Sequence, residues 1–136
     1  MDEVRKEHAR ERLNNLPLAK LIGMRLADIS SNEAVVTVEM RDDLKQPSGV
    51  MHGGITATLI DTAMAFAVRT YLTDDEPTAT IDLTIHYLRP IVSGTAICTA
   101  KVVRPGKRIF TVSADVVNDE GKVVATGLST YTRIEQ

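Results

Sequence analysis

The sequence has no tryptophan and only one cysteine, Cys98, among its 136 residues. A lone cysteine excludes an internal disulfide and suits a reducing compartment. Its place in an alternating, β-rich stretch predicts a buried thiol that packs in the core. Because no histidine or asparagine lies near Cys98 in the sequence, we do not expect it to act as a catalytic nucleophile.

An excess of positive charge is also missing. The chain holds 16 Lys and Arg against 18 Asp and Glu, a net charge of −2. We therefore expect no nucleic-acid partner, because phosphate neutralisation needs a basic excess. The charged N-terminus has no apolar signal segment, and Asp61 and Arg69 interrupt the only long apolar run, residues 53–72. These features predict no membrane span and a cytoplasmic location.

Signatures of metal and nucleotide sites are missing as well. The three histidines, His8, His52 and His86, show no ligand-like spacing, so we expect no metal. The sequence has no phosphate loop, no dinucleotide fingerprint and no Gly-x-Ser-x-Gly elbow. We accordingly predict no metal and no organic cofactor, and exclude an α/β-hydrolase mechanism.

Periodicity and turn residues predict the elements. Helices are expected over residues 2–14 and 55–72, with a helical turn over 16–23, β-structure over 24–40 and a loop over 41–51. Strands follow at 79–88, 95–103, 109–117 and 123–134. Short turns between strands imply an antiparallel sheet, and an apolar helix must be covered on most sides. We predict an α+β fold, a curved antiparallel sheet wrapped around one long central helix. Residues 1–136 form one domain in this prediction, with residues 1–16 as an N-terminal helical extension.

The strand predicted over residues 79–88 alternates between two faces. Ala79, Ile81, Leu83, Ile85 and Tyr87 share one face in this pattern, and Thr80, Asp82, Thr84 and His86 share the other. We interpret His86 as a surface or interface histidine.

Asp61 is the first candidate for chemistry. It is the only ionisable residue between Ile55 and Val68 on the predicted apolar helix. A carboxylate in apolar surroundings is costly unless it has a partner, and such positions favour a general base or a nucleophile. A capping, pairing or exposed aspartate fits the helix pattern equally well.

The segment His52-Gly53-Gly54 is the second candidate, because it stands where the long helix should begin. Free N–H groups at a helix start can stabilise a developing oxyanion, and glycines allow a ligand close approach. Asp61 lies about two turns downstream, roughly 11 Å along the axis. One chain's Asp61 is therefore not expected to reach a carbonyl at its own helix start, and two chains could each supply half of a site.

The stretches Gln46–Gly54, Leu59–Ala63, Thr80–Pro90 and Arg104–Arg108 together resemble the hotdog-fold thioesterases, specifically the phenylacetate-degradation (PaaI-type) branch. The resemblance covers about residues 17–134. It implies a hotdog fold and an acyl-coenzyme A thioesterase that needs no cofactor. It also implies a homodimer with shared active sites, commonly paired into a homotetramer.

The same resemblance implies a role for each motif residue. Asp61 activates water or attacks the thioester, the Gly53 amide polarises the carbonyl, and Gln46 orients the water or the carbonyl. Asn is common in the family where this chain has Gln46. Thr80 helps to hold the water, and His52 orients the reacting groups.

Substrate-binding residues are expected around this centre. Met51, Gly54 and Thr62 are candidates beside the thioester, and Met51, Met64 and Phe66 could line an acyl pocket for an aromatic or medium chain. Basic side chains could pair with the coenzyme A phosphates. The candidates for that contact are Arg89, Lys107 and Arg108, with Arg104 beside them.

Two other functional hypotheses compete with that of a thioesterase. A hotdog hydratase resembles a pattern in which a histidine closely follows the aspartate, whereas here the nearby His52 precedes Asp61. The other is a non-catalytic acyl-coenzyme A sensor, such as a hotdog domain attached to a DNA-binding helix-turn-helix. The predicted N-terminal helix is too short for such a module, and sensors tend to lose the catalytic acid, which this chain retains as Asp61. The acyl group, the choice between base and nucleophile, and the pathway stay open.

Overall fold

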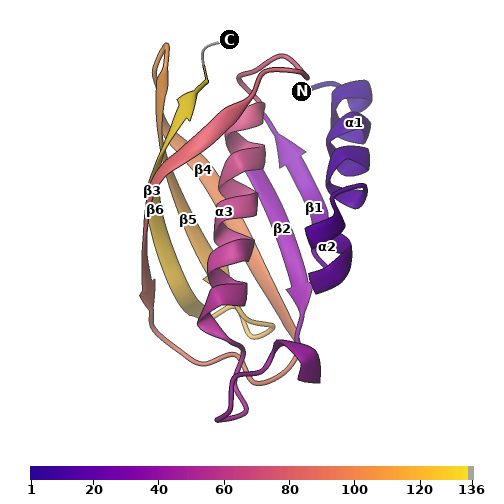
Figure 1. Ribbon diagram of the computed structural model, residues 1–136, viewed down its shortest axis with the longest axis vertical. Coiled ribbons are helices and arrows are strands. Elements are labelled where there is room, and N and C mark those ends of the chain that lie inside the picture. Colours follow the sequence, from indigo (N-terminus) through magenta and orange to yellow (C-terminus); the bar gives the residue numbers. More distant parts are fainter. Residues whose placement is uncertain (135–136) are drawn as a thin grey trace.

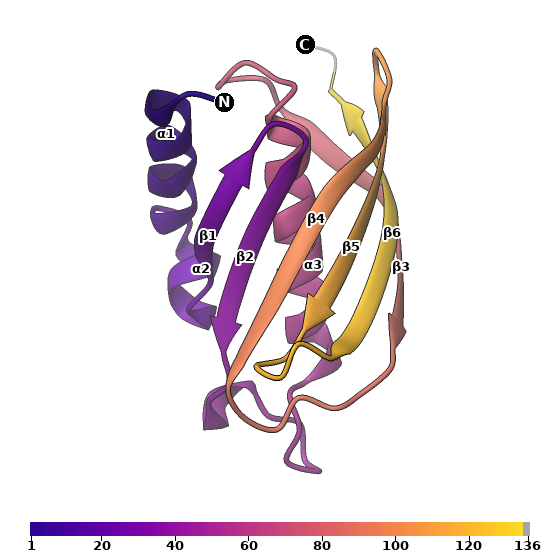
Figure 2. The same cartoon turned by 180° about the vertical axis from the view of Figure 1, so that it is seen from behind.

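One six-stranded antiparallel sheet, in the order β1-β2-β4-β5-β6-β3, forms the body of the computed structural model, which describes residues 1–134 (Figures 1 and 2). Its strands are β1 (Arg25–Ser30), β2 (Glu33–Glu39), β3 (Thr78–Tyr87), β4 (Thr95–Pro105), β5 (Ile109–Val117) and β6 (Val123–Arg133). The helices are α1 (Glu3–Asn14), α2 (Pro17–Ile22) and α3 (Gly53–Arg69), with a 3-10 turn η1 at Asp42–Leu44.

Helix α3 lies across one face of the curved sheet, and the strands bend around it (Figure 1). Its buried side includes Leu59, Ile60, Ala63 and Met64, each fully shielded from solvent. The opposing strands supply small and β-branched side chains, among them the buried Val36. The predicted curved sheet around a central helix is confirmed, and it is the hotdog architecture.

Gly127 on β6 sets how closely α3 approaches the sheet. A Cβ atom at this position would lie 3.0 Å from the Ile60 Cγ2 and 3.3 Å from the Met64 Cε. Real side chains seldom come so close, since protein interiors are already tightly packed. The missing side chain therefore lets the middle of α3, where Asp61 lies, sit directly against β6.

The N-terminal helix is confirmed over Glu3–Asn14. It packs beside β1, the sheet edge opposite β3, and Leu13 is its buried anchor. Helix α2 follows and ends at Gly23, whose φ of 88° is a left-handed conformation that glycine adopts without strain. No helix within residues 1–134 is long and apolar enough to cross a membrane.

The predicted face assignment along β3 is wrong at its beginning, because a β-bulge interrupts the pairing with β6. Thr80 pairs with Tyr131, but Asp82 pairs with Thr130, so Ile81 is the extra residue. A bulge adds one residue to one strand and reverses the alternation beyond it. Thr80 therefore shares the helix-facing side with Leu83, although simple alternation had placed it with Asp82.

Candidate functional site

The start of α3 is capped by His52. Its Nδ1 accepts a hydrogen bond from the Gly54 N–H at 2.8 Å, and its carbonyl accepts one from the Ile55 N–H at 2.9 Å. The Gly53 N–H has no hydrogen-bond acceptor among the residues described. A helix start points such free N–H groups outward, where they can stabilise negative charge.

Tyr87, the last residue of β3, contacts Gly53 from the sheet. Its hydroxyl donates to the Gly53 carbonyl at 2.7 Å. A Cβ atom at Gly53 would meet the tyrosine ring at 3.3 Å, so the ring lies directly against this backbone. The helix start is thus held by His52 and by Tyr87, while the Gly53 N–H has no acceptor in the part of the chain that the structure describes.

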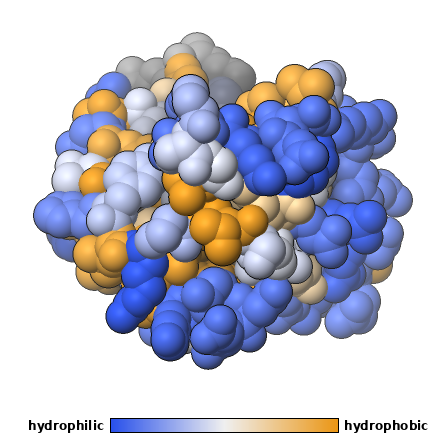
Figure 3. Space-filling model, turned by 90° about the horizontal axis from the view of Figure 1, so that it is seen from below, coloured by the Kyte–Doolittle hydropathy of each residue, from blue (hydrophilic) through white to orange (hydrophobic). Residues whose placement is uncertain are grey.

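A cavity of about 350 Å³ opens beside this helix start. Four of the predicted site residues line it, Gln46, Met51, Gly53 and Arg89. Apolar and mixed side chains complete the lining, and these are Val50, Thr56, Tyr87, Leu88, Pro90, Ile91 and Val124. Figure 3 views the end of the molecule where α3 begins and shows hydrophobic side chains at its centre among hydrophilic ones. The cavity therefore offers an apolar wall next to a free amide and a guanidinium.

Asp61 does not line this cavity, and neither do the other predicted residues further along α3. Its carboxylate lies over the helix-facing side of β3 and β6. Thr80 Oγ1 donates to Asp61 Oδ1 at 2.8 Å, and the Tyr131 hydroxyl donates to the same oxygen in a short hydrogen bond. The structure thus brings together Asp61 and Thr80 in one group, and Gly53, Gln46 and Met51 in another. Gly54, Thr62, Met64 and Phe66 fall outside the cavity lining.

Tyr131 belongs with Asp61 and Thr80, although the sequence did not predict it as a site residue. It is buried, at 2% exposure, and its hydroxyl also lies 2.7 Å from the Asp61 carbonyl oxygen. Burial, followed by the hydrogen bond with Asp61, raises the pKa of Tyr131 above its ordinary value. The hydroxyl therefore keeps its proton and stays a hydrogen-bond donor at physiological pH. Alternation along the last strand could have placed Tyr131 on a buried face, but only the pairing of β6 with β3 sets it opposite Thr80.

The basic residues predicted to bind the coenzyme A phosphates lie at two opposite ends of the sheet. Arg89 lines the cavity, and its guanidinium donates to the Val123 carbonyl at 2.7 Å. Lys107 and Arg108 are exposed in the turn between β4 and β5, at the opposite end of the sheet from the start of α3 (Figure 1). Within one chain they are therefore remote from Gly53, and their role in phosphate binding stays a prediction.

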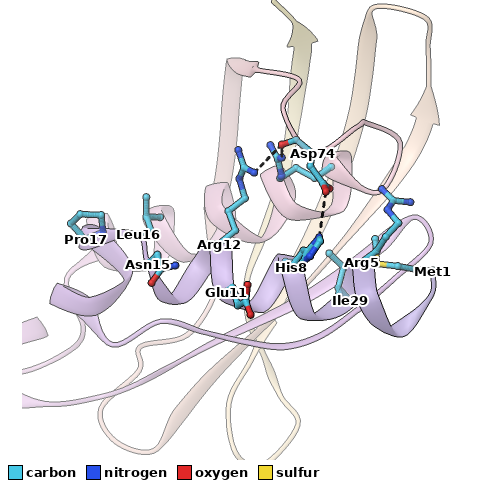
Figure 4. A pocket seen from close by; sticks show the side chains of 12 residues that line it. Met1, Arg5, His8, Glu11, Arg12, Asn15, Leu16, Pro17, Ile29 and Asp74 are labelled. Carbon is cyan, nitrogen blue, oxygen red and sulfur yellow. Dashed lines mark hydrogen bonds and ion pairs between the residues drawn. The ribbon is translucent and has the colours of Figure 1, made fainter.

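A larger hollow of about 500 Å³ lies between α1 and the end of α3. Figure 4 shows Arg12 and His8 of α1 directed toward Asp74, where Arg12 donates to the Asp74 carbonyl at 2.8 Å and His8 pairs with its carboxylate at 3.4 Å. Arg5 donates to the Leu72 carbonyl, and Arg69 also donates to the Asp74 carbonyl. Because Arg5, His8 and Arg12 bind α1 to the chain after α3, we interpret this hollow as structural.

Known proteins resemble this chain in sequence. A family model described as the thioesterase superfamily matches residues 48–125, which include both the helix start and Asp61. A putative esterase of Halobacterium salinarum is 35% identical over 125 residues, covering 84% of this chain and 82% of the relative. Human acyl-coenzyme A thioesterase 13 is 30% identical over 108 residues, covering 77% of this chain and 76% of that protein.

Solved structures share the whole architecture. The Escherichia coli PaaI protein from the phenylacetic acid degradation operon superposes with a TM-score of 0.86 at 28% identity. The match covers 95% of this chain and 92% of that one. The similarity therefore extends well beyond the segment that the family model matches.

Proposed function

The chain belongs to the thioesterase superfamily, and we propose that it is a PaaI-type acyl-coenzyme A thioesterase. The products would be a free acid and coenzyme A. The observation that carries this proposal is a carboxylate, Asp61, held by two hydroxyl donors on the face of α3 that meets β3 and β6. A free Gly53 amide beside an apolar cavity supplies the complementary half.

The active site in this proposal is shared between two chains. Gly53 lines the cavity and Asp61 of the same chain does not, although both belong to α3. They stand about two helical turns apart, roughly 11 Å along the axis. A thioester carbonyl bound at Gly53 of one chain would therefore meet Asp61 of a second chain, while Gln46 and His52 orient the reacting groups.

The edge of the sheet supports a homodimer. Within residues 1–134, strand β3 pairs only with β6, so its other edge keeps unpaired backbone groups. Ile81, Tyr87 and Leu88 along and just beyond this strand are exposed at 55%, 54% and 55%. An exposed strand edge with apolar side chains favours pairing with another chain. A second copy that pairs here would continue the sheet, and a tetramer made of two such dimers stays a prediction, as does a cytoplasmic location.

The proposed chemistry needs only protein groups and water. The Gly53 N–H donates to the thioester carbonyl oxygen, where negative charge develops. Asp61 takes a proton from water, and the resulting hydroxide adds to the carbonyl carbon. The tetrahedral intermediate collapses, the carbon–sulfur bond breaks, and the proton on Asp61 passes to the departing thiolate. Attack by Asp61 itself, through an anhydride that water then opens, gives the same products. Within residues 1–134 no group of three His, Cys, Asp or Glu side chains could hold a metal ion.

The acyl group in this proposal is aromatic or of medium chain length. The cavity wall formed by Met51, Ile91 and Val124 is apolar and would accept either. Arg89 at the same cavity, with Lys107 and Arg108 contributed by a neighbouring chain, would pair with the coenzyme A phosphates.

A panel of acyl-coenzyme A substrates tests the activity. Release of the free thiol is followed with a chromogenic disulfide, using aromatic, short, medium and long acyl chains. We expect turnover to be fastest with an aromatic or a medium-chain thioester. Tight binding without turnover of any member would instead support an acyl-coenzyme A sensor and contradict the proposal.

A mixed dimer tests the shared site. Asp61→Asn removes the acid, and Gly53→Pro removes the amide N–H, so each homodimer should be nearly inactive. A heterodimer purified through two different tags contains one intact site and one doubly damaged site. Because a two-fold interface makes two equivalent sites, we expect about half of the wild-type activity per dimer. An inactive heterodimer would show that Asp61 and Gly53 work within one chain.

A further inference from the structure

The two oxygens of the Asp61 carboxylate differ in their hydrogen bonds. Oδ1 accepts hydrogen bonds from both Thr80 Oγ1, at 2.8 Å, and the Tyr131 hydroxyl, in the short contact described above. Oδ2 accepts no hydrogen bond from any residue that the structure describes. A carboxylate oxygen offers two lone pairs, so two donors are enough to occupy Oδ1.

This arrangement is built by strand pairing. Thr80 and Tyr131 stand directly opposite each other on β3 and β6, and the bulge at Ile81 keeps both on the helix-facing side. Directly opposed side chains on one face of an antiparallel pair lie within contact distance. Their hydroxyls therefore reach the same oxygen of Asp61 from neighbouring strands.

The two donors differ in how firmly they are held. Thr80 lies on the exposed edge strand, whereas Tyr131 is one of the largest fully buried side chains. The Tyr131 hydroxyl also lies within hydrogen-bond distance of the Asp61 backbone carbonyl, so one group contacts both the main chain and the side chain of the same residue. The rigid member of the pair is therefore Tyr131, and it fixes the carboxylate relative to α3.

We propose that Tyr131 is a positioning residue that holds Asp61 through Oδ1 and leaves Oδ2 as the oxygen that reacts with water or with the thioester. This inference rests on the proposed thioesterase function. In this role Tyr131 does not contact the substrate. It restricts the carboxylate to one orientation, and orientation of a reacting group contributes strongly to rate.

Tyr131→Phe tests the proposal, because it removes only the hydroxyl. We expect kcat to fall about 10- to 100-fold while KM for the acyl-coenzyme A stays within about twofold, since misplacement of a reacting group affects the chemical step. Thr80→Val removes the other donor and should also lower kcat, with KM within about twofold of the wild type.

Tyr71→Phe is the matched control. Its hydroxyl donates to Asn32 Oδ1 at 2.5 Å, so this variant also loses one tyrosine hydrogen bond. Among the described residues, that bond does not involve Asp61, and Tyr71 does not line the cavity. We expect its kcat and KM to equal those of the wild type. An equal loss of kcat in Tyr71→Phe would overturn the proposal, because the effect would then be one of general stability.

The split between kcat and KM separates the outcomes. An active wild type with an unaltered kcat in Tyr131→Phe would overturn the positioning role alone. A wild type that hydrolyses no thioester would instead overturn the proposed function and the inference with it.

Discussion

Replacing Gly53 by proline removes the N–H that the proposed mechanism assigns to the thioester carbonyl. Gly53 is the first residue of α3, a position where proline is well tolerated because its N–H has no helical partner. The preceding His52 has a ψ of 132°, inside the extended range that a residue before proline prefers. The cap hydrogen bonds run to the Gly54 and Ile55 N–H groups, so they survive the substitution.

The expected loss comes from a single hydrogen bond. Removal of one oxyanion donor lowers kcat by about 100- to 1000-fold, or about 2.7–4 kcal/mol of transition-state stabilisation. Gly53→Ala is the matched control, because it adds a Cβ atom at the same place, 3.3 Å from the Tyr87 ring, but keeps the N–H. The ring is more than half exposed and can move, so we expect the alanine variant to retain kcat within about tenfold, or about 1.4 kcal/mol.

The assay is steady-state thiol release at saturating acyl-coenzyme A, with thermal melts of both variants as a check on folding. Comparing proline with alanine cancels the effect of the Cβ atom on Tyr87. The remaining difference is the proline ring, whose Cδ atom takes the place of the N–H hydrogen. If Gly53→Pro is folded and as active as Gly53→Ala, the Gly53 amide is not the oxyanion donor.

Three further predictions concern packing, the thiol and acid stability. Gly127→Ala should destabilise the protein by about 1–3 kcal/mol in denaturant titrations, since a Cβ there would lie 3.0 Å from Ile60 Cγ2; unchanged stability would mean that α3 shifts freely. Burial raises the pKa of the Cys98 thiol, so native protein should not react with the chromogenic disulfide, whereas unfolded protein should, and Cys98→Ala should keep full activity. The hydrogen bond from the Thr73 N–H lowers the pKa of the Glu76 carboxyl below its ordinary value of 4.5. The stability that this carboxylate provides is therefore complete above that pH and lost as the pH falls further. Glu76→Gln should make Tm fall less steeply in acid, and a fall as steep as that of the wild type would contradict the assignment.

The sequence was sufficient for the elements and for the architecture. An apolar helix that must be covered, followed by alternating strands with short turns, predicts a sheet wrapped around α3, and the structure has one. The order of the strands was not accessible, because it depends on pairings between distant segments such as β3 and β6. Local periodicity carries no information on which strand lies next to which.

The site was predictable only in part, because some of its contacts also depend on pairing between distant segments. Asp61 stands out as a lone charge on an apolar helix, and its hydrogen bonds with Thr80 and Tyr131 now give it defined partners. Simple alternation placed Thr80 on the wrong face, because a bulge adds one residue without an obvious sequence signal. Tyr131 was missed because its importance comes from a partner 70 residues away in the chain.

Replacement of Asp61 by asparagine is the most direct test of the central claim. The side chain keeps its shape, and its amide oxygen can still accept from Thr80 and Tyr131, so the fold should be preserved. The variant has no carboxylate to take a proton or to attack the thioester. We predict that kcat at saturating acyl-coenzyme A falls by at least about 1000-fold, with an unchanged thermal melt, since loss of a general base alone costs about 100- to 10,000-fold. A folded Asp61→Asn variant with kcat within about tenfold of the wild type would contradict the account.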